Sequence, residues 1–359
     1  MQSRLERFPT SALRHGGTMA RRLVLVAFLL VASDWRALAA PLGLRAGGST
    51  LVTPVMREWT VEYGTKKGIT VDYASVGSGQ GITGMTDTSF DFGCTDAPMS
   101  DGELKKALLN GGPVLHIPVA MGAVAPIYNL PEVKERLRFS GPVLAATFLG
   151  RIERWNDPAL QALNPGVALP NEAIGVVHRM DSSGTTYVWT DFLSKTSPEW
   201  EKAVGTGKSV DWPVGVSATG NEGVAGQVKL FPGSIGYAQL TYGIQESLAY
   251  GSVENSSGAF IEPRPSAVTA AADSSLTLIP DDLRFSMTDA PGQDAYPVSA
   301  TTWAIVYVKP PSGKGRDVAD FLRWVIHDGQ RFNEPLHYAA LPPALVERAE
   351  RKIDQLASK

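Results

Sequence analysis

Three short turns in the sequence combine glycine with serine or threonine just before a predicted helix. They are AGGSTLVTPV at 46–55, ASVGSGQGIT at 74–83 and HRMDSSGTTYVW at 178–189. Glycine lets the backbone approach a ligand closely, hydroxyl groups donate hydrogen bonds, and the first N–H groups of a helix have no intrahelical partner. Because these N–H groups also carry a partial positive charge, turns of this kind are suited to holding a small anion.

The third turn also contains a cation. Arg179 brings five N–H donors in a fixed planar group, and Ser183 and Thr185 bring hydroxyls. Ser183, Gly184 and Thr185 can in addition present consecutive backbone N–H groups. Taken alone, such a turn is typical of an ordinary helix cap, and an arginine there is typical of an ion pair, here with Asp181.

The other two turns offer hydroxyls without a charge. Ser49 and Thr50 follow two glycines and precede Pro54, which favours the first turn of a helix. Ser78 stands between two further glycines. Each of these turns is also explained by helix capping alone. Only their convergence on one point would make an anion site.

The elements that must position these turns alternate between β-like and helical runs, which is typical of α/β architecture with largely parallel sheets. The expected strands are 70–75, 90–94, 173–177, 234–237 and 303–308, and the expected helices are 54–63, 81–86, 101–109, 185–194, 221–230 and 318–328. Ligands of α/β sheets bind beyond the carboxyl ends of the strands, so the three turns are expected to meet there. The Pro/Gly/Ser-rich segment 251–265 is expected to be a surface excursion.

The N-terminus has the pattern of a secretory signal peptide. Arg21 and Arg22 precede an apolar run at 23–32, and an Ala-Leu-Ala sequence at 37–39 supplies a cleavage site. The run is too short to cross a bilayer, which needs roughly 20 residues. Met19 precedes the basic pair, so residues 1–18 are either an extension of the signal or an over-long start. We therefore expect residues 1–39 to be removed and the protein to reach the periplasm.

The charge balance argues against nucleic acid as a partner. Removal of six arginines and two acidic residues with the signal takes the net charge from −3 to −7. Phosphate backbones are held by clustered lysine and arginine, which the remaining sequence lacks. No second apolar span follows the signal, so the mature chain is expected not to insert into a membrane.

Enzyme and metal chemistry have weak support in the sequence. The serines do not lie in a G-x-S-x-G elbow, and no His/Cys/carboxylate group has metal-ligand spacing, so no cofactor is expected. The single cysteine, Cys94, lies in an apolar run and is expected to be a buried thiol. His178 is the only histidine of the mature chain near a candidate turn, where we expect it to add partial positive potential.

Residues 46–350 resemble the periplasmic phosphate-binding proteins of high-affinity ABC phosphate transporters. The matching stretches occur in order along the chain: GGSTLVTPVMREW, VDYASVGSGQGI, DFGCTDAPMS, FLGRIERWNDPAL, LNPGVALP, DSSGTTYVWTDFL, EWEKAVGTGKSVDWPVG, GNEGVAG, GSIGYAQLTYG and DAYPVSATTWAIV. The resemblance implies a two-lobed, hinged "Venus flytrap" fold that closes over one phosphate ion. It implies no enzymatic activity and a monomeric protein that delivers phosphate to membrane permease subunits.

The resemblance also implies which residues bind phosphate. The family's positions fall on Thr50, Leu51, Ser78, Asp96, Arg179, Ser183, Gly184 and Thr185, with Asp181 expected to orient the arginine. Two positions depart from the family pattern. Leu51 replaces a residue that is usually aromatic, which should matter little if only its backbone N–H contacts the anion. Ser182 replaces a frequent glycine, and the direction of its side chain does not follow from the sequence.

Asp96 is the residue that would select the ligand. Phosphate near neutral pH still carries an O–H, and a buried carboxylate can accept its hydrogen bond, whereas fully ionised sulfate offers no proton and would face a like charge. Sulfate, molybdate and arsenate remain alternative ligands on the same fold. A phosphate sensor or scavenger that serves no permease is the alternative function.

The two lobes are expected to be discontinuous in sequence. Lobe I comprises residues 40–122 and 298–359, and lobe II comprises residues 123–297. The chain should cross between them near 120–125 and 296–301, and these extended segments are the predicted hinge.

Overall fold

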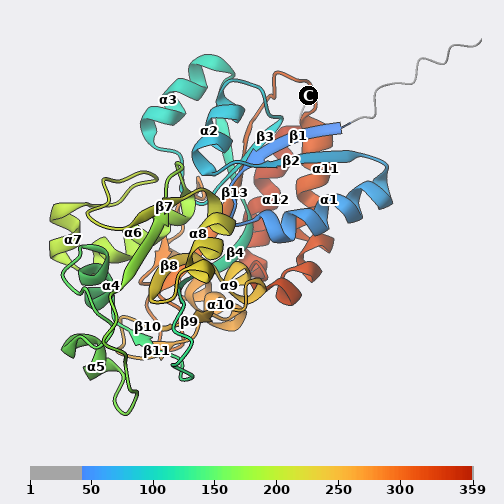
Figure 1. Cartoon of the computed structure of the whole chain (residues 1–359). Coiled ribbons are helices and arrows are strands. Elements are labelled where there is room, and N and C mark those ends of the chain that lie inside the picture. Colours follow the sequence, from blue (N-terminus) through green and yellow to red (C-terminus); the bar gives the residue numbers. More distant parts are fainter. Residues whose placement is uncertain (1–42, 358–359) are drawn as a thin grey trace, which may run out of the picture. The chain divides into compact units, whose positions relative to one another are not determined.

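A computed structural model of the chain describes residues 43–357 (Figure 1). The predicted signal peptide, residues 1–39, lies outside the described residues. The strands are β1 (Gly43–Gly48), β2 (Thr70–Ser75), β3 (Phe92–Thr95), β4 (Val114–Tyr128), β5 (Arg138–Phe139), β6 (Gly175–Arg179), β7 (Val216–Ala218), β8 (Ser234–Gln239), β9 (Ala249–Tyr250), β10 (Ser252–Glu254), β11 (Phe260–Ile261), β12 (Met287–Thr288), β13 (Val298–Tyr307) and β14 (Tyr338–Ala339).

Helices connect these strands in the α/β pattern that the sequence predicts. They are α1 (Thr53–Lys67), α2 (Ser78–Thr86), α3 (Asp101–Asn110), α4 (Gly141–Phe148), α5 (Pro158–Leu163), α6 (Gly184–Thr196), α7 (Pro198–Ala203), α8 (Gly220–Leu230), α9 (Leu240–Gln245), α10 (Pro265–Ser275), α11 (Gly315–Ile326) and α12 (Pro343–Ala357), with short 3-10 turns η1 (Leu276–Leu278), η2 (Asp328–Phe332) and η3 (Glu334–Leu336). Each predicted strand and helix is confirmed, with boundaries that shift by a few residues. At the start of α3, Ser100 and Glu103 form a reciprocal capping box.

The main sheet is mixed rather than largely parallel. Its strand order is β2-β1-β3-β13-β4-β8-β6-β7. The outer pairs β1–β2, β1–β3, β6–β7 and β6–β8 are parallel, whereas β13 and β4 run antiparallel to their neighbours in the middle. The prediction of largely parallel pairing is therefore wrong for the centre of the sheet. Parallel pairing follows from the local β-helix-β pattern, but β13 joins the sheet from far along the chain.

The long strand β4 joins two parts of the sheet. It pairs with β13 through residues 114–123 and with β8 through residues 124–128. We call β2, β1, β3, β13 and the start of β4 the first half, and the end of β4 with β8, β6 and β7 the second half. Only the segment 120–125 of this strand was expected to be extended, because Pro118 and Pro126 lack the N–H that a central strand donates. A register shift between Thr302 and Trp303 lies opposite Pro118.

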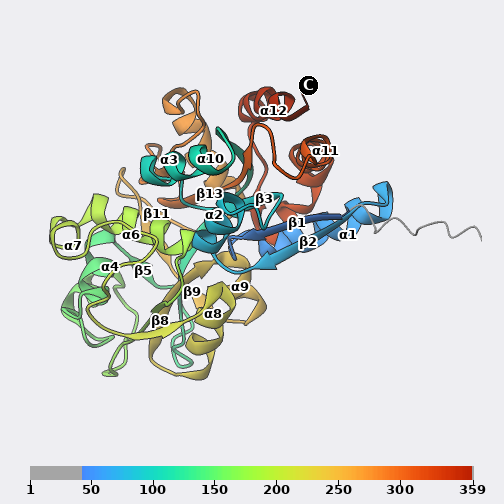
Figure 2. The ribbon, with the colours of Figure 1, turned by 90° about the horizontal axis from the view of Figure 1, so that it is seen from above.

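Each half carries its own layer of helices. In the first half α1 packs on β2, and Tyr63 of α1 meets Phe321 of α11 at a ring-centroid distance of 5.0 Å. In the second half α8 packs on β8 and β6, and α6 lies against α4 (Figures 1 and 2). No helix in the described part of the chain is long and apolar enough to span a membrane.

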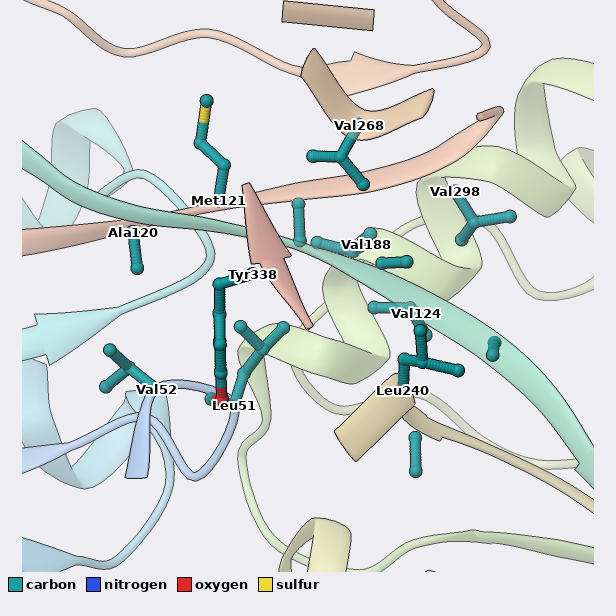
Figure 3. Close-up of a cluster of buried hydrophobic side chains, with 14 of the residues drawn as sticks. Leu51, Val52, Ala120, Met121, Val124, Val188, Leu240, Val268, Val298 and Tyr338 are labelled. Carbon is teal, nitrogen blue, oxygen red and sulfur yellow. The ribbon is translucent and has the colours of Figure 1, made fainter. Parts of the chain in front are cut away.

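The apolar core is continuous along β4. Met121 and Val124 of this strand are buried together with Leu51 and Val52, which follow β1, and with Tyr338 of β14 (Figure 3). Buried aliphatic side chains of this kind contribute about 1.5–3 kcal/mol each to stability. The turn after β1 is thus anchored by its apolar residues, which leaves its polar residues fixed in place.

The segment 251–265 is not a plain surface excursion. It contains β10 and β11, which form a small three-stranded sheet with β5, and Val253 is fully buried. The prediction is wrong because a Gly/Pro/Ser-rich composition signals turns but does not exclude short strands between them. This sheet lies outside the candidate site.

Candidate functional site

The candidate site lies at the strand ends where the direction of the connections reverses. In the first half β1 stands between β2 and β3, and in the second half β6 stands between β8 and β7. A crevice opens beyond the carboxyl ends of strands at such switch points. The three turns that the sequence singled out all lie at these ends.

The structure brings the predicted site residues together from both halves. Thr50 and Leu51 follow β1, Ser78 begins α2, Asp96 follows β3, Arg179 ends β6, Ser183 caps α6, and Gly184 and Thr185 begin that helix. Gly184 shows how closely the halves approach. A Cβ atom at this position would lie only 2.6 Å from Oδ2 of Asp96. Glycine is therefore required where α6 meets the first half.

Asp96 is the acceptor at the centre of the site. The hydroxyl of Ser49 donates to both carboxylate oxygens at 2.6 and 2.7 Å, and the hydroxyl of Thr302 donates to Oδ1 at 2.6 Å. Ser78 Oγ lies 3.4 Å from Oδ2 and accepts the backbone N–H of Asp96 at 3.1 Å. The residue is only 2% exposed, so the hydroxyls replace water as its hydrogen-bond donors.

Burial changes the acidity of this carboxyl group. It raises the pKa of Asp96 to about 6, although the hydroxyls of Ser49 and Thr302 and the charge of Arg179 act in the opposite direction. At neutral pH Asp96 is therefore ionised and remains a hydrogen-bond acceptor. The hydroxyls that surround this carboxylate donate hydrogen bonds to it.

Arg179 is held rigidly by Asp181. Its Nε and Nη2 atoms donate to the two carboxylate oxygens of Asp181 at 2.8 and 2.5 Å. Burial alone would raise the pKa of Asp181, but the hydrogen bonds and charge of Arg179 outweigh it and leave that pKa below its usual value. Asp181 also accepts the N–H of Gly220 at 3.0 Å. The pair fixes the guanidinium of Arg179, a residue that is only 3% exposed, at the end of β6.

The start of α6 offers fewer N–H groups than the sequence predicts. The N–H of Ser183 donates to the carbonyl oxygen of Lys208 at 2.8 Å, so the predicted run of three free N–H groups is reduced to two. The hydroxyl of Ser183 caps the helix by accepting the N–H of Thr186 at 3.0 Å. Gly184 and Thr185 are the first two residues of α6, and their N–H groups have no acceptor within the helix.

The turn after β1 is tied to the core. Leu51 is fully buried, and its carbonyl accepts the hydroxyl of Tyr338 at 2.5 Å (Figure 3). Its N–H donates to Ser49 Oγ at 3.0 Å, within the turn. The side chain at this position therefore belongs to the core and does not line the site. Tyr242 donates to the carbonyl of Thr50 at 2.7 Å and links this turn to the second half.

The structure gives Ser182 a definite place. Its carbonyl oxygen accepts the N–H of Gly79 at 2.9 Å, and its side chain lies directly against that glycine, where any Cβ atom would overlap it. Gly79 is in α2 of the first half, whereas Ser182 belongs to the turn after β6. Ser182 is therefore a contact between the halves.

His178 does not have the predicted electrostatic role. Its ring stacks on Trp212 with a centroid distance of 4.8 Å, and burial lowers the pKa of this imidazole. It is therefore neutral near pH 7, and the expected positive contribution is wrong. The sequence could not show the tryptophan that covers the ring. The prediction for Cys94 is confirmed, because this thiol is free and fully buried.

Two polar residues that contact the predicted site residues were not predicted. Asn221 at the start of α8 is fully buried and donates to Thr50 and to Thr185. Thr302 of β13 donates to Asp96. Asn221 lies in the GNEGVAG stretch, but an uncharged side chain gave no chemical signal of its own. Thr302 lies 206 residues from Asp96 along the chain, so only the sheet reveals the contact.

Among residues 43–357, no group of three or more histidine, cysteine, aspartate and glutamate side chains is placed to hold a metal ion. The polar groups of the candidate site are instead hydroxyls, backbone N–H groups, one guanidinium and one central carboxylate.

A two-half α/β fold with a polar site between strand ends defines a class of solute-binding proteins. Residues 36–328 match the model of the PBP superfamily domain. A solved phosphate ABC transporter substrate-binding protein from Clostridium perfringens, with bound phosphate, superposes with a TM-score of 0.62 at 17% identity, covering 84% of this chain and 100% of that one. A high-affinity periplasmic phosphate-binding protein, PfluDING, gives 0.68 at 18% identity, covering 86% and 93%.

Curated relatives are closer in sequence. The phosphate-binding protein PstS of Xylella fastidiosa strain Temecula1 is 38% identical over 309 residues, covering 86% of this chain and 84% of the relative. PstS of Methanocaldococcus jannaschii is 37% identical over 317 residues, covering 82% and 80%. The chain belongs to this PstS family of phosphate-binding proteins. These relatives are binding proteins and not enzymes.

Proposed function

We propose that this protein captures inorganic phosphate at the site around Asp96 and Arg179 and delivers it to the permease subunits of an ABC phosphate importer. The observation that carries the proposal is a single buried acceptor, Asp96, set among donors. Phosphate near neutral pH has one O–H and several oxygens that only accept. A site with one acceptor and many donors matches that distribution of hydrogen-bonding groups. The PstS relatives, which are named as phosphate-binding proteins, support the same ligand.

The proposed ligands within the site are those that the sequence identifies. Arg179 balances the negative charge, and the N–H groups of Gly184 and Thr185 donate at the positive end of α6. Thr50, Ser78 and Ser183 contribute hydroxyls. Leu51 contributes its N–H, which in this structure donates to Ser49 Oγ, so the anion would share or replace that bond.

We further propose that the two halves are lobes that close on the ligand. Lobe I corresponds to residues 40–122 and 298–359 and lobe II to residues 123–297, with β4 and the start of β13 as the connecting segments. Several bonds join the lobes in this structure, including the Lys208–Glu103 ion pair at 2.7 Å. Charge-assisted bonds made on closure would supply the affinity.

We also propose that the mature protein is a periplasmic monomer released by cleavage after residue 39. One of the solved structural neighbours is a periplasmic phosphate-binding protein, which supports this location. The charge of −7 left after cleavage again disfavours nucleic acid as a partner.

Calorimetry on the ligand-stripped mature protein tests the function. We expect tight binding of phosphate, weaker binding of arsenate, which carries a similar proton, and no detectable binding of sulfate. Equal binding of sulfate and phosphate would refute the role of Asp96. Import of phosphate by a strain that lacks its own binding protein, restored by this chain, separates transport from sensing or scavenging.

Lobe closure has its own test at Gly79. Alanine at this position is expected to weaken phosphate binding by roughly tenfold to hundredfold, because the added methyl group overlaps Ser182 and overpacking of this kind costs about 1–3 kcal/mol. Titration calorimetry measures the affinity, and small-angle scattering with saturating phosphate measures closure.

Two further variants control for this effect. Gly226→Ala in α8 places a methyl group where no atom beyond the helix's own nearby backbone lies within 4 Å, and it should bind phosphate normally. The Ser182→Gly change made together with Gly79→Ala removes the overlapping side chain and should restore most of the affinity. A Gly79→Ala protein that binds as tightly as the wild type would show that this contact is absent from the bound state.

A further inference from the structure

We propose that Asn221 is a positioning residue that forces the hydroxyls of Thr50 and Thr185 to act as donors toward the bound anion. This inference rests on the proposed phosphate site and adds a residue to it. Asn221 lies in the first turn of α8 and is fully buried. Its role follows from the hydrogen bonds that it makes.

The amide of Asn221 bridges the two threonines. Its Nδ2 atom lies 2.7 Å from Thr50 Oγ1 and 3.0 Å from Thr185 Oγ1. These threonines come from different turns, one after β1 and the other at the start of α6. A single amide nitrogen, with two hydrogens to donate, therefore serves a hydroxyl in each half of the molecule.

The orientation of this amide is fixed by its other end. Oδ1 of Asn221 accepts the backbone N–H of Gln239 at 2.9 Å. A backbone N–H can only donate, so the atom that faces it must be the amide oxygen. The nitrogen then has to face the two threonines, because reversing the amide would set its NH₂ group against the N–H of Gln239.

Both threonine oxygens have their two lone pairs occupied. Thr50 Oγ1 accepts from the Asn221 side chain and also from the Asn221 backbone N–H at 3.2 Å. Thr185 Oγ1 accepts from Asn221 and from Nη1 of Arg179 at 3.4 Å. A hydroxyl has one hydrogen and two lone pairs. Each hydroxyl is left with only its hydrogen to offer, which it can give to an oxygen of the anion.

The arrangement has a consequence for selection. If neither threonine can accept a hydrogen bond, the proton of the anion has to be received elsewhere, and Asp96 is the acceptor provided. Asn221 thereby keeps the two threonine hydroxyls as donors and leaves Asp96 as the one acceptor of the site. The bond from Asn221 to Thr50 also joins the two halves, so this polarity is established when the site closes.

The test is a double-mutant cycle between Asn221→Ala and Thr50→Val, with phosphate affinity measured by calorimetry. In the wild-type background Asn221→Ala is expected to weaken binding by roughly tenfold to hundredfold, the range for hydrogen bonds to charged groups. In the Thr50→Val background the same change should cost at least ~3-fold less, because one of the two hydroxyls that Asn221 orients is already gone.

Asn164→Ala is the matched control. Asn164 is also a buried asparagine, 3% exposed, but it bonds to the backbone of Arg138 and Leu160, away from the site. Its loss should lower the melting temperature and leave phosphate affinity unchanged. This separates a general loss of stability from a specific loss of binding.

The outcomes distinguish this inference from the proposed function. A wild-type protein that does not bind phosphate would refute the function itself. If the wild type binds and Asn221→Ala binds within twofold of it, the positioning role is refuted while the function stands. An equal cost of Asn221→Ala in both backgrounds would refute the proposed action of Asn221 through the Thr50 hydroxyl.

Discussion

Replacement of Arg179 by alanine is expected to abolish measurable phosphate binding while the protein remains folded. The guanidinium is almost fully buried and supplies the positive charge beside Asp96 and Thr185. Its removal also leaves Asp181 without its bidentate partner, so a carboxylate would face the incoming anion. Breaking a buried ion pair typically costs about 3–5 kcal/mol, which corresponds to roughly 10²–10⁴ in affinity if the loss falls on the bound state.

Calorimetry with phosphate measures this loss, and circular dichroism during heating shows whether the fold persists. Arg154→Ala is the control, because Arg154 is an exposed arginine of the second half. Within the described chain, the hydrogen bonds of its side chain go to Asn171. This variant should bind normally. An unchanged affinity in Arg179→Ala would mean that the turn at 178–189 is only a helix cap.

Asp96→Asn is expected to remove most of the discrimination between phosphate and sulfate. The asparagine keeps the shape of the side chain, but its amide can donate to sulfate and no longer sets a negative charge against it. Sites built to hydrogen-bond a group reject analogues that lack it by roughly 10⁴–10⁵. We expect the ratio of sulfate to phosphate dissociation constants to fall by at least ~100-fold.

Discrimination should also depend on pH in the wild type. Burial raises the pKa of Asp96 to about 6, so the group is ionised above that pH and becomes protonated as the pH falls through it. A protonated Asp96 can donate a hydrogen bond, so sulfate binding should appear below about pH 6 and vanish above it. In Asp96→Asn, which has no such titration, the sulfate affinity should stay nearly constant over the same range.

Asp91→Asn is the control for both experiments. Asp91 is another buried aspartate of the first half, paired with Lys314 and with the N–H of Arg45, outside the site. This variant should lose stability and keep the discrimination. Sulfate rejection that survives in Asp96→Asn, or that does not change with pH in the wild type, would assign selectivity to another group.

The parts of the site that depend on neighbouring residues were predictable. Ser183 caps α6, and Arg179 pairs with Asp181 two positions away, because helix ends and short turns are determined by local sequence. The strand end before Asp96 follows from the predicted strand at 90–94, whereas the strand that precedes Thr50 was not among those predicted. The family resemblance then indicated which of these turns share a ligand.

Other features depend on chain segments that meet only in the fold. Asp96 takes its donors from Ser49, Ser78 and Thr302, and no spacing rule links these positions. The neutral state of His178 depends on burial beneath Trp212. Such environments arise from packing, which the sequence pattern of one segment does not contain.

By itself, the sequence determined which turns carry donors just before a helix, and its family resemblance indicated which residue could accept a proton. Only the tertiary structure decided which way those donors point. β4 joins the two halves, and the turns after β1 and β6 then meet across Asn221, which occupies the lone pairs of both threonine hydroxyls. The polarity of a hydroxyl is set by its neighbours in space, and these neighbours come from separate segments of the chain.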